Sequence, residues 1–343
     1  MGIGKHVLSA AALALVIGMV SATTMGSFTA SGSKEKYLYF CTGDPNDVMT
    51  KTSGGLLLAG GSTDVDAGMK WMIDKSGGGD FVVIRATGTD AYDPWIYNDL
   101  GGVNSCETII IQASAGSYDP FVINKIRSAE ALFIAGGDQW DYVRLWKGTP
   151  VEDAIQFVAS KPAPVGGTSA GLAVLGQFVF SAQNNTLYPE KALLNPYDHK
   201  VTIARDFLSL PNMADKITDS HFVARDRMGR LVTFLARIVQ DGWSEGARGL
   251  GVNEKTALGV EPNGEVTLFG LSNTSSAYFL STPGPPQVCK DGTPLTYLDV
   301  SVIRMTAGAS FNLGTWHGVG VTEYTISAGA GTLTSTQPGG SIY

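Results

Sequence analysis

The sequence predicts an α/β fold built on an open, mostly parallel sheet with helices on both faces. Short apolar runs alternate with helix-like segments through the first half of the chain. Each run is apolar at consecutive positions, which is typical of strands buried on both faces of a parallel sheet. Hydrophobic residues make up 44% of the 343 residues and charged residues only 16%, so the chain can bury a large core.

The alternation is clearest before residue 161. The expected strands are the apolar runs 55–61, 80–86, 107–113 and 131–137. The expected helices are 66–77, 120–130 and 149–160. Thr149 and Pro150 suit the start of the last helix, as an N-cap residue and a first-turn proline. Strands that alternate with helices in this way form βαβ units, which pair their strands in parallel.

After residue 255 the helix-like patterns give way to strand-like ones. Asn263 and Gly264 form an expected turn between two strands within 256–270. Further strands are expected within 298–313 and 318–334. We interpret this β-rich part, about residues 256–334, as an extension of the same domain.

These boundaries predict a single α/β domain over residues 54–334. Residues 23–53 are polar and are expected to form an irregular lead-in, and residues 335–343 a loose tail. The amino terminus has the pattern of a secretory signal, with a basic start at Lys5 and a short apolar run that ends in small residues. We expect residues 1–22 to be a signal peptide and the mature protein to be secreted, extracellular or periplasmic. An uncleaved membrane anchor is the alternative.

Composition limits the function classes. The net charge of −7 argues against a nucleic-acid-binding protein, which needs a basic face. Cys41, Cys106 and Cys289 allow one disulfide in an oxidising compartment, and the sequence leaves the pairing open. The histidines and cysteines do not cluster at metal-ligand spacing, so we expect no structural zinc.

The stretch PVGGTSAGLAVLG places Ser169 between two glycines, Gly167 and Gly171. Small neighbours let the backbone close a sharp strand-to-helix turn that presents a serine hydroxyl above the sheet edge. We therefore predict a nucleophile elbow, followed by a helix within 169–180 whose amino terminus would favour an oxyanion. A glycine-rich turn with an idle serine is the alternative.

A serine nucleophile needs a base, and His221 lies in the unusual run TDSHFVARDRMGRL. The alternatives are a solvated charged loop and a different base, His317. Glu254 ends another apolar run, GLGVNE, and could orient the imidazole. The resulting chain order is Ser169, His221, Glu254, which differs from the serine, acid, histidine order of lipase-like hydrolases.

The motifs FIAGGDQWDY, GGTSAGLAVLG, TDSHFVARDRMGRL and GLGVNEKTALGVE stand in the same order as those of the cyanophycinase-like serine peptidases. This family, peptidase family S51, also contains aspartyl dipeptidase. The resemblance extends over roughly residues 54–262. It implies that Ser169 is the nucleophile, His221 the general base and then acid, and Glu254 the group that orients His221.

The resemblance also implies the surroundings of the site and the fold. Backbone N–H groups of Gly137 and Ala170 would form the oxyanion hole. The implied substrate-binding residues are Gln139, Asp219, Arg225, Arg227 and Arg230. The implied fold is that of class I glutamine amidotransferases, without a metal or an organic cofactor. Ser220 departs from the pattern, since some cyanophycinases have glutamine before the histidine.

The resemblance points to a secreted serine exopeptidase that cuts cyanophycin, a poly-aspartate with arginine branches, into β-Asp-Arg dipeptides through an acyl-enzyme. An aspartyl or isoaspartyl dipeptidase is the alternative within the family. A non-catalytic relative that binds carboxylates is the alternative outside the enzymes. The expected partner is the aspartyl and arginyl polymer, with no nucleic acid and no membrane after signal cleavage. A homodimer is a further expectation, and the sequence does not fix the oligomeric state.

Overall fold

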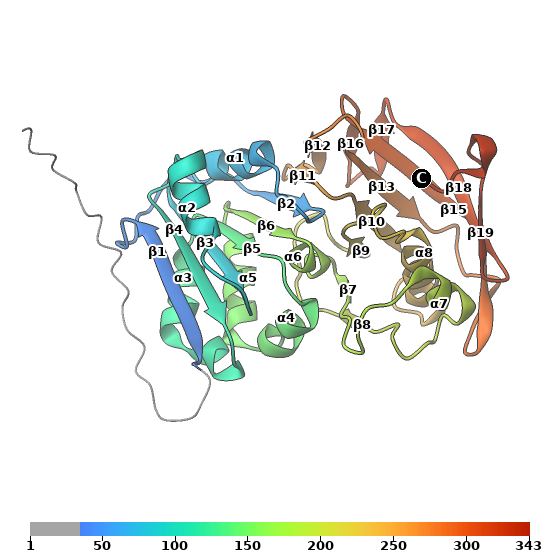
Figure 1. Cartoon of the computed structure of the whole chain (residues 1–343), viewed down its shortest axis with the longest axis horizontal. Coiled ribbons are helices and arrows are strands. Elements are labelled where there is room, and N and C mark those ends of the chain that lie inside the picture. Colours follow the sequence, from blue (N-terminus) through green and yellow to red (C-terminus); the bar gives the residue numbers. More distant parts are fainter. Residues whose placement is uncertain (1–34) are drawn as a thin grey trace, which may run out of the picture.

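The structure is a computed structural model that describes residues 35–343. The predicted signal peptide at 1–22 and the first part of the lead-in, 23–34, lie outside the described residues. Within 35–343, no helix combines the length and the apolar character that crossing a bilayer requires. The structure has two β-sheets. The earlier part of the chain lies on the left of Figure 1 and the later part on the right, and strands of the later part join both sheets.

The first sheet has ten strands, and only its centre is parallel. Its strand order is β1-β4-β3-β5-β6-β2-β11-β12-β16-β17. The central strands, which pair in parallel, are β4 (Ser105–Ile111), β3 (Asp80–Arg85), β5 (Ala131–Ile134), β6 (Pro164–Thr168) and β2 (Gly55–Ala59). The antiparallel flanks are β1 (Tyr37–Gly43), β11 (Thr256–Val260), β12 (Glu265–Gly270), β16 (Ser310–Asn312) and β17 (His317–Val319). The sheet is therefore mixed, where the sequence predicted a mostly parallel one.

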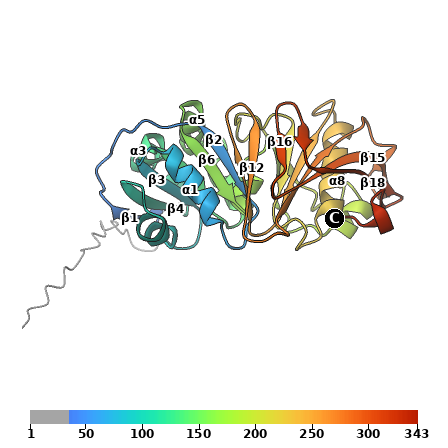
Figure 2. The ribbon, with the colours of Figure 1, turned by 90° about the horizontal axis from the view of Figure 1, so that it is seen from above.

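Helices cover both faces of the parallel centre, as Figure 2 shows from above. The consecutive apolar residues of each strand explain this, because neighbours along a strand point to opposite faces. Leu57 joins the buried cluster of α1 (Asp66–Lys75). Leu58 joins the cluster that holds α3 (Pro120–Ser128), α4 (Gln139–Trp146) and α5 (Pro150–Ser160). The Thr149 hydroxyl accepts the Val151 N–H at the start of α5, as the predicted cap requires.

The second sheet belongs to the later half of the chain. Its order is β19-β18-β15-β13-β10-β9-β7-β8, and β14 pairs with β15. Its strands are β7 (Phe178–Phe180), β8 (Ile203–Arg205), β9 (Lys216–Asp219), β10 (Arg248–Val252), β13 (Ser276–Ser281), β14 (Val288–Lys290), β15 (Thr293–Thr306), β18 (Thr322–Gly329) and β19 (Thr332–Ser335). Helices α7 (Pro189–Leu194) and α8 (Met228–Gln240) share its hydrophobic core. The β-rich segment thus divides between two sheets.

The expected irregular lead-in contains a strand, which corrects the prediction for residues 23–53. β1 pairs antiparallel with β4 along seven residues. Aromatic side chains at alternate positions hold it there, since the Tyr37 ring stacks on Phe121 and the Tyr39 ring meets Phe121 edge-on. The sequence analysis did not predict this short edge strand, because the residues on both sides of it are polar.

The expected loose tail is also anchored at its last residue. The Tyr343 ring packs edge-on against Phe222, and its hydroxyl accepts the Met228 N–H and donates to Asp226. These contacts tie the carboxyl end of the chain to the start of α8.

The helix expected within 169–180 is only one turn long. α6 spans Ala170–Ala173, and the chain then turns into β7 of the second sheet. Gly176 permits this turn, because a Cβ there would lie 2.8 Å from the carbonyl oxygens of Lys216 and Phe178. So short a helix contributes little macrodipole, so an oxyanion here would depend on individual amides.

Candidate active site

The candidate site lies where strands of the two sheets end together (Figure 1). Ser169 follows β6 of the first sheet, and His221 follows β9 of the second. Glu254 lies in the short link from β10 of the second sheet to β11 of the first. The backbone ties these ends together, since the His221 N–H donates to the Gly60 carbonyl at the end of β2, 2.7 Å away.

Ser169 has the strained backbone of a nucleophile elbow. Its φ of 54° and ψ of −111° are rare for a residue with a side chain. The flanking glycines let the turn close, because a Cβ on Gly171 would lie 1.9 Å from the Ile134 carbonyl oxygen. The strain therefore lies at the serine that the motif singled out.

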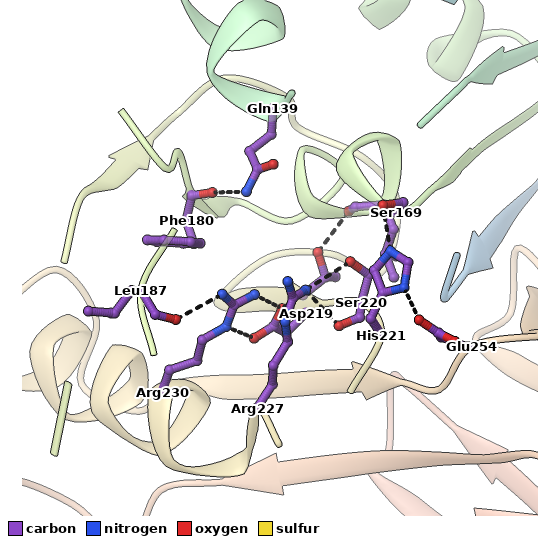
Figure 3. Close-up of polar contacts among 12 residues, drawn as sticks. Gln139, Ser169, Phe180, Leu187, Asp219, Ser220, His221, Arg227, Arg230 and Glu254 are labelled. Atoms are coloured by element: carbon purple, nitrogen blue, oxygen red, sulfur yellow. Dashed lines mark hydrogen bonds and ion pairs between the residues drawn. The ribbon is translucent and has the colours of Figure 1, made fainter. Parts of the chain in front are cut away.

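Ser169, His221 and Glu254 form a continuous hydrogen-bonded array (Figure 3). The Ser169 Oγ lies 2.8 Å from Nε2 of His221, and Nδ1 of His221 lies 2.6 Å from Oε1 of Glu254. The carboxylate accepts the proton on Nδ1, which leaves Nε2 free to accept the serine proton. This tautomer is the one that a general base requires.

The surroundings of His221 keep the imidazole neutral near pH 7. Burial lowers its pKa below the ordinary value of 6.5. The hydrogen bond to Glu254 acts in the opposite direction, and the positive charges of Arg225 and Arg227 lower the pKa further. A neutral imidazole can accept the Ser169 proton without first losing one of its own.

The other described histidines lie elsewhere. The His317 side chain is exposed in β17, the last strand of the first sheet. The His199 side chain is 73% exposed beside Asp198. Of the histidines in 35–343, only His221 has a hydrogen bond to Ser169.

Gly61 is a site residue that the sequence did not single out, although it ends the apolar run of β2. It has a φ of +93°, and a Cβ there would lie 2.6 Å from both Cε1 and Nε2 of His221. The imidazole thus packs directly against a bare backbone. The only signal in the sequence was the pair Gly60 and Gly61, which follows β2, the strand that pairs with β6.

Gly61→Ala is expected to push the imidazole away from Ser169 and to lower kcat/KM by about 100-fold, the usual cost of misplacing a catalytic group by about 1 Å. Steady-state kinetics of peptide hydrolysis measures this. Gly242→Ala is the matched control, because Gly242 also has a positive φ, +69°, but has open space around its Cα. Equal activity of the Gly61→Ala variant and the control would contradict the role of this contact.

A pocket of about 70 Å³ opens beside Ser169 and His221. We call it the arginine pocket. Its lining includes every substrate and oxyanion residue that the resemblance implied, namely Gly137, Gln139, Ala170, Asp219, Arg225, Arg227 and Arg230. Three guanidinium groups against one carboxylate leave it positively charged, and such a pocket favours an anionic group such as a carboxylate.

Asp219 has a different environment from the one expected of an acid that grips a substrate arginine. Arg230 donates to both of its oxygens, with Nε 2.7 Å from Oδ2, and Arg227 Nη1 lies 3.1 Å from Oδ1. The Asp219 and Arg230 side chains are almost fully buried. The carboxylate is thus occupied by the protein's own arginines, and its role is to hold them in place.

The remaining pocket residues differ in how firmly they are held. Burial lowers the pKa of Arg227 to about 10, so it stays charged at neutral pH, and its Nη1 also donates to the Ser220 carbonyl. Arg225 is exposed at the rim, and its side chain forms no ion pair within 35–343. The Gln139 amide donates to the Phe180 carbonyl over 3.3 Å.

Gly137 and Ala170, whose backbone amides the resemblance implied as oxyanion donors, both line the arginine pocket. Ala170 begins α6, so its N–H has no acceptor within the helix. Gly137 lines the same pocket in the loop after β5. A carbonyl held at Ser169 could thus develop negative charge close to these donors.

The described residues contain no candidate metal site and no disulfide. Among residues 35–343, no group of three or more His, Cys, Asp or Glu side chains is placed to hold a metal ion. Cys41, Cys106 and Cys289 are free thiols. Cys41 pairs with Glu107 and Cys106 with Thr42 across β1 and β4, so the two thiols point to opposite faces of the sheet.

Known proteins resemble this chain in sequence and in fold. The sequence profile of peptidase family S51 matches residues 96–198. The chain is 25% identical over 181 residues to a cyanophycinase of Synechococcus elongatus, a match that covers 52% of this chain and 51% of that protein. It is 27% identical over 218 residues to a cyanophycinase of Trichormus variabilis, covering 63% and 64%. The chain thus spans between about half and two thirds of the curated relatives it matches.

The crystal structure of a peptidase from an acI-B1 Actinobacterium superposes with a TM-score of 0.50 at 15% sequence identity, over 76% of this chain and 98% of the other. At this identity the likeness concerns the fold alone.

Proposed function

We propose that this chain, which resembles peptidase family S51 and its cyanophycinases in sequence, is a serine peptidase that cleaves aspartyl peptides through Ser169, His221 and Glu254. The observation that carries this proposal is the unbroken array from the Ser169 hydroxyl to the Glu254 carboxylate, with contacts of 2.8 Å and 2.6 Å. The positively charged pocket beside the serine supports an anionic substrate residue.

In the proposed reaction the Ser169 Oγ attacks the scissile carbonyl carbon as its proton passes to Nε2 of His221. Glu254 stabilises the resulting imidazolium through Nδ1–H. The carbonyl oxygen becomes an oxyanion and accepts from the amides of Gly137 and Ala170. The C–N bond then breaks, the leaving amine takes the proton from His221, and the acyl group stays on Ser169. A water molecule, deprotonated by His221, then attacks the acyl carbon, the bond to Ser169 Oγ breaks, and the imidazolium returns its proton to that oxygen.

The proposed substrate is cyanophycin, and the products are β-Asp-Arg dipeptides. Each arginine branch is joined through its amino group, so it keeps a free carboxylate and a free guanidinium group. The arginine pocket suits the carboxylate. Its volume of about 70 Å³ admits a small anionic group and not a whole branch, so the rest of the polymer would lie outside it.

Mass analysis of the soluble products tests this function. We expect the protein to release β-Asp-Arg dipeptides from insoluble cyanophycin faster than it cleaves short Asp-X peptides. Release from short Asp-X peptides alone would favour an aspartyl dipeptidase. No product from either substrate would contradict the proposed peptidase activity.

The pH dependence of kcat/KM should report the His221 pKa. Protonated imidazole cannot accept the serine proton, so activity should fall as the pH drops through a pKa below 6.5 and should level off at neutral pH. In the Arg225→Gln variant this acidic fall in kcat/KM should occur at a higher pH, because the Arg225 charge lowers the His221 pKa. An acidic fall in kcat/KM at the same pH in the variant and the wild-type protein, or activity that rises with acidity, would contradict the role of His221 as the general base.

We further propose two finer features. The fold belongs to the class I glutamine amidotransferase type, which the parallel centre and the nucleophile after β6 support. The protein is exported, and the support for this is the signal-like pattern at 1–22. Comparing the amino-terminal residue of the protein from medium or periplasm with that of the protein from the cytoplasm tests export.

A further inference from the structure

A second cavity, of about 290 Å³, opens at the carboxyl edge of the first sheet. It lies between the loop after β2 and the segment after β3, which forms α2 (Tyr92–Pro94) and the π-helix η1 (Trp95–Leu100). Its lining is Thr63, Asp64, Asp66, Ala91, Tyr92 and Trp95. We call it the acidic cavity, since its only ionisable groups besides the tyrosine are two carboxylates.

The ion pairs of the described residues leave out both carboxylates of the acidic cavity, Asp64 and Asp66. Oδ2 of Asp64 accepts from the Tyr92 hydroxyl at 2.6 Å. The buried Oδ1 has no hydrogen-bond partner within residues 35–343 at normal geometry, and the Thr168 hydroxyl is the polar side chain that acts on the carboxylate besides Tyr92. Burial raises the pKa of Asp64. A buried carboxylate in this state is stabilised by any cation that reaches it.

Two aromatic rings complete the wall. The ring centroids of Tyr92 and Trp95 lie 6.0 Å apart with planes tilted by 55°. Aromatic faces attract cations, and the flat guanidinium group stacks on them while its edge donates to carboxylates. Carboxylates and aromatic rings on one concave surface are therefore complementary to a guanidinium group.

The cation already nearby does not neutralise the acidic cavity. Arg85 ends β3, and its guanidinium donates to the carbonyls of Thr87, Thr89 and Gly136. It forms no ion pair with Asp64 or Asp66.

The acidic cavity is connected to the nucleophile through the loop after β2 and the end of β6. The loop that carries Asp64 includes Gly61, where a Cβ would lie 3.1 Å from the Cβ of Ser169. Asp64 also lies close enough to Thr168, the residue before Ser169, for the threonine side chain to lower the Asp64 pKa. The arginine pocket is formed instead by the loops after β5, β6 and β9. One positively charged site thus includes Ser169, and a site with two carboxylates lies on the neighbouring loop.

We propose that the acidic cavity binds the guanidinium group of a substrate arginine while a substrate carboxylate occupies the arginine pocket. This inference rests on the proposed function, and it names the substrate group that the second cavity selects. It makes the enzyme selective for chains that carry both a cation and an anion near the scissile bond.

Binding to the Ser169→Ala protein tests the inference without turnover. The probes are Nα-acetyl-arginine amide and Nα-acetyl-citrulline amide, which have closely similar shapes and differ in charge. Neither probe has a carboxylate, so neither has the anionic group that the arginine pocket favours. We expect calorimetry to show that the arginine probe binds at least about tenfold more tightly, the usual value of a charged hydrogen bond.

Variants of the cavity wall locate the binding. In the Ser169→Ala background, Asp66→Asn and Trp95→Leu should each weaken the arginine probe several-fold, and Asp64→Asn more strongly. Asp74→Asn is the matched control, because it removes the same charge from an exposed position on α1 and should change nothing. Thermal unfolding identifies any variant that loses its fold. If Asp64→Asn unfolds the protein, Asp66→Asn still tests the inference, because Asp66 is exposed.

The outcomes separate this inference from the proposed function. Equal affinities for the two probes, or unchanged affinity in both Asp66→Asn and Trp95→Leu, would overturn the inference even if the wild-type protein releases dipeptides from cyanophycin. Selective arginine binding that these variants weaken would support the cation site even if the wild-type protein releases no product, and the proposed function alone would then fail.

Discussion

Replacing Ser169 with alanine is expected to abolish peptide hydrolysis, with kcat falling by about 10⁴-fold to 10⁶-fold, as when a member of a serine catalytic array is removed. The change deletes one oxygen from a partly exposed side chain and leaves the elbow backbone as it is. The fold should therefore be unaffected. Dipeptide release from cyanophycin measures the activity, and thermal unfolding measures the fold.

Ser160→Ala provides the control for this prediction. Ser160 is exposed at the end of α5 and donates only to the Phe157 carbonyl, so its loss should leave the rate unchanged. A Ser169→Ala protein that keeps the wild-type rate would remove Ser169 from the mechanism, however close it lies to His221.

Asp219→Ala is expected to destabilise the protein by about 3–5 kcal/mol, the usual cost of removing one partner from a buried ion pair. The variant would leave the guanidinium groups of Arg227 and Arg230 buried without their shared carboxylate. Urea unfolding measures the free energy. At temperatures where the variant remains folded, KM should rise, because the two arginines lose the group that positions them.

The comparison for Asp219 is a surface pair. Asp141 pairs with Arg144 on α4, where the arginine side chain is 44% exposed. Asp141→Ala should cost less than about 1 kcal/mol, because water screens such pairs. Similar unfolding free energies for the two variants would show that Asp219 does not organise the arginine pocket.

The serine, histidine and glutamate could be predicted because each carries a local signal. Glycines at fixed spacing mark the elbow at Ser169, and the motifs that resemble peptidase family S51 supply His221 and Glu254. The strands of the parallel centre were predictable for a similar reason, since burial on both faces leaves a continuous apolar run.

The features that the sequence missed depend on contacts between distant segments. β1 is held by β4 and by the Phe121 ring, and neither is visible in the polar segment itself. Asp219 was expected to bind substrate, and only the fold shows that Arg227 and Arg230 occupy its carboxylate. Gly61 is a site residue because His221, which follows β9, packs against it at the end of β2, and this contact is visible only in the fold.

The central claim is that His221 activates the Ser169 hydroxyl. Labelling with a serine-directed phosphonate, followed by peptide mapping, tests this most directly. We predict a single adduct on Ser169 in the wild-type protein, and labelling slowed by at least about 100-fold in His221→Ala, since general base assistance is worth this much or more. An unlabelled Ser169 in the folded wild-type protein, or equal labelling rates in the two proteins, would contradict the claim.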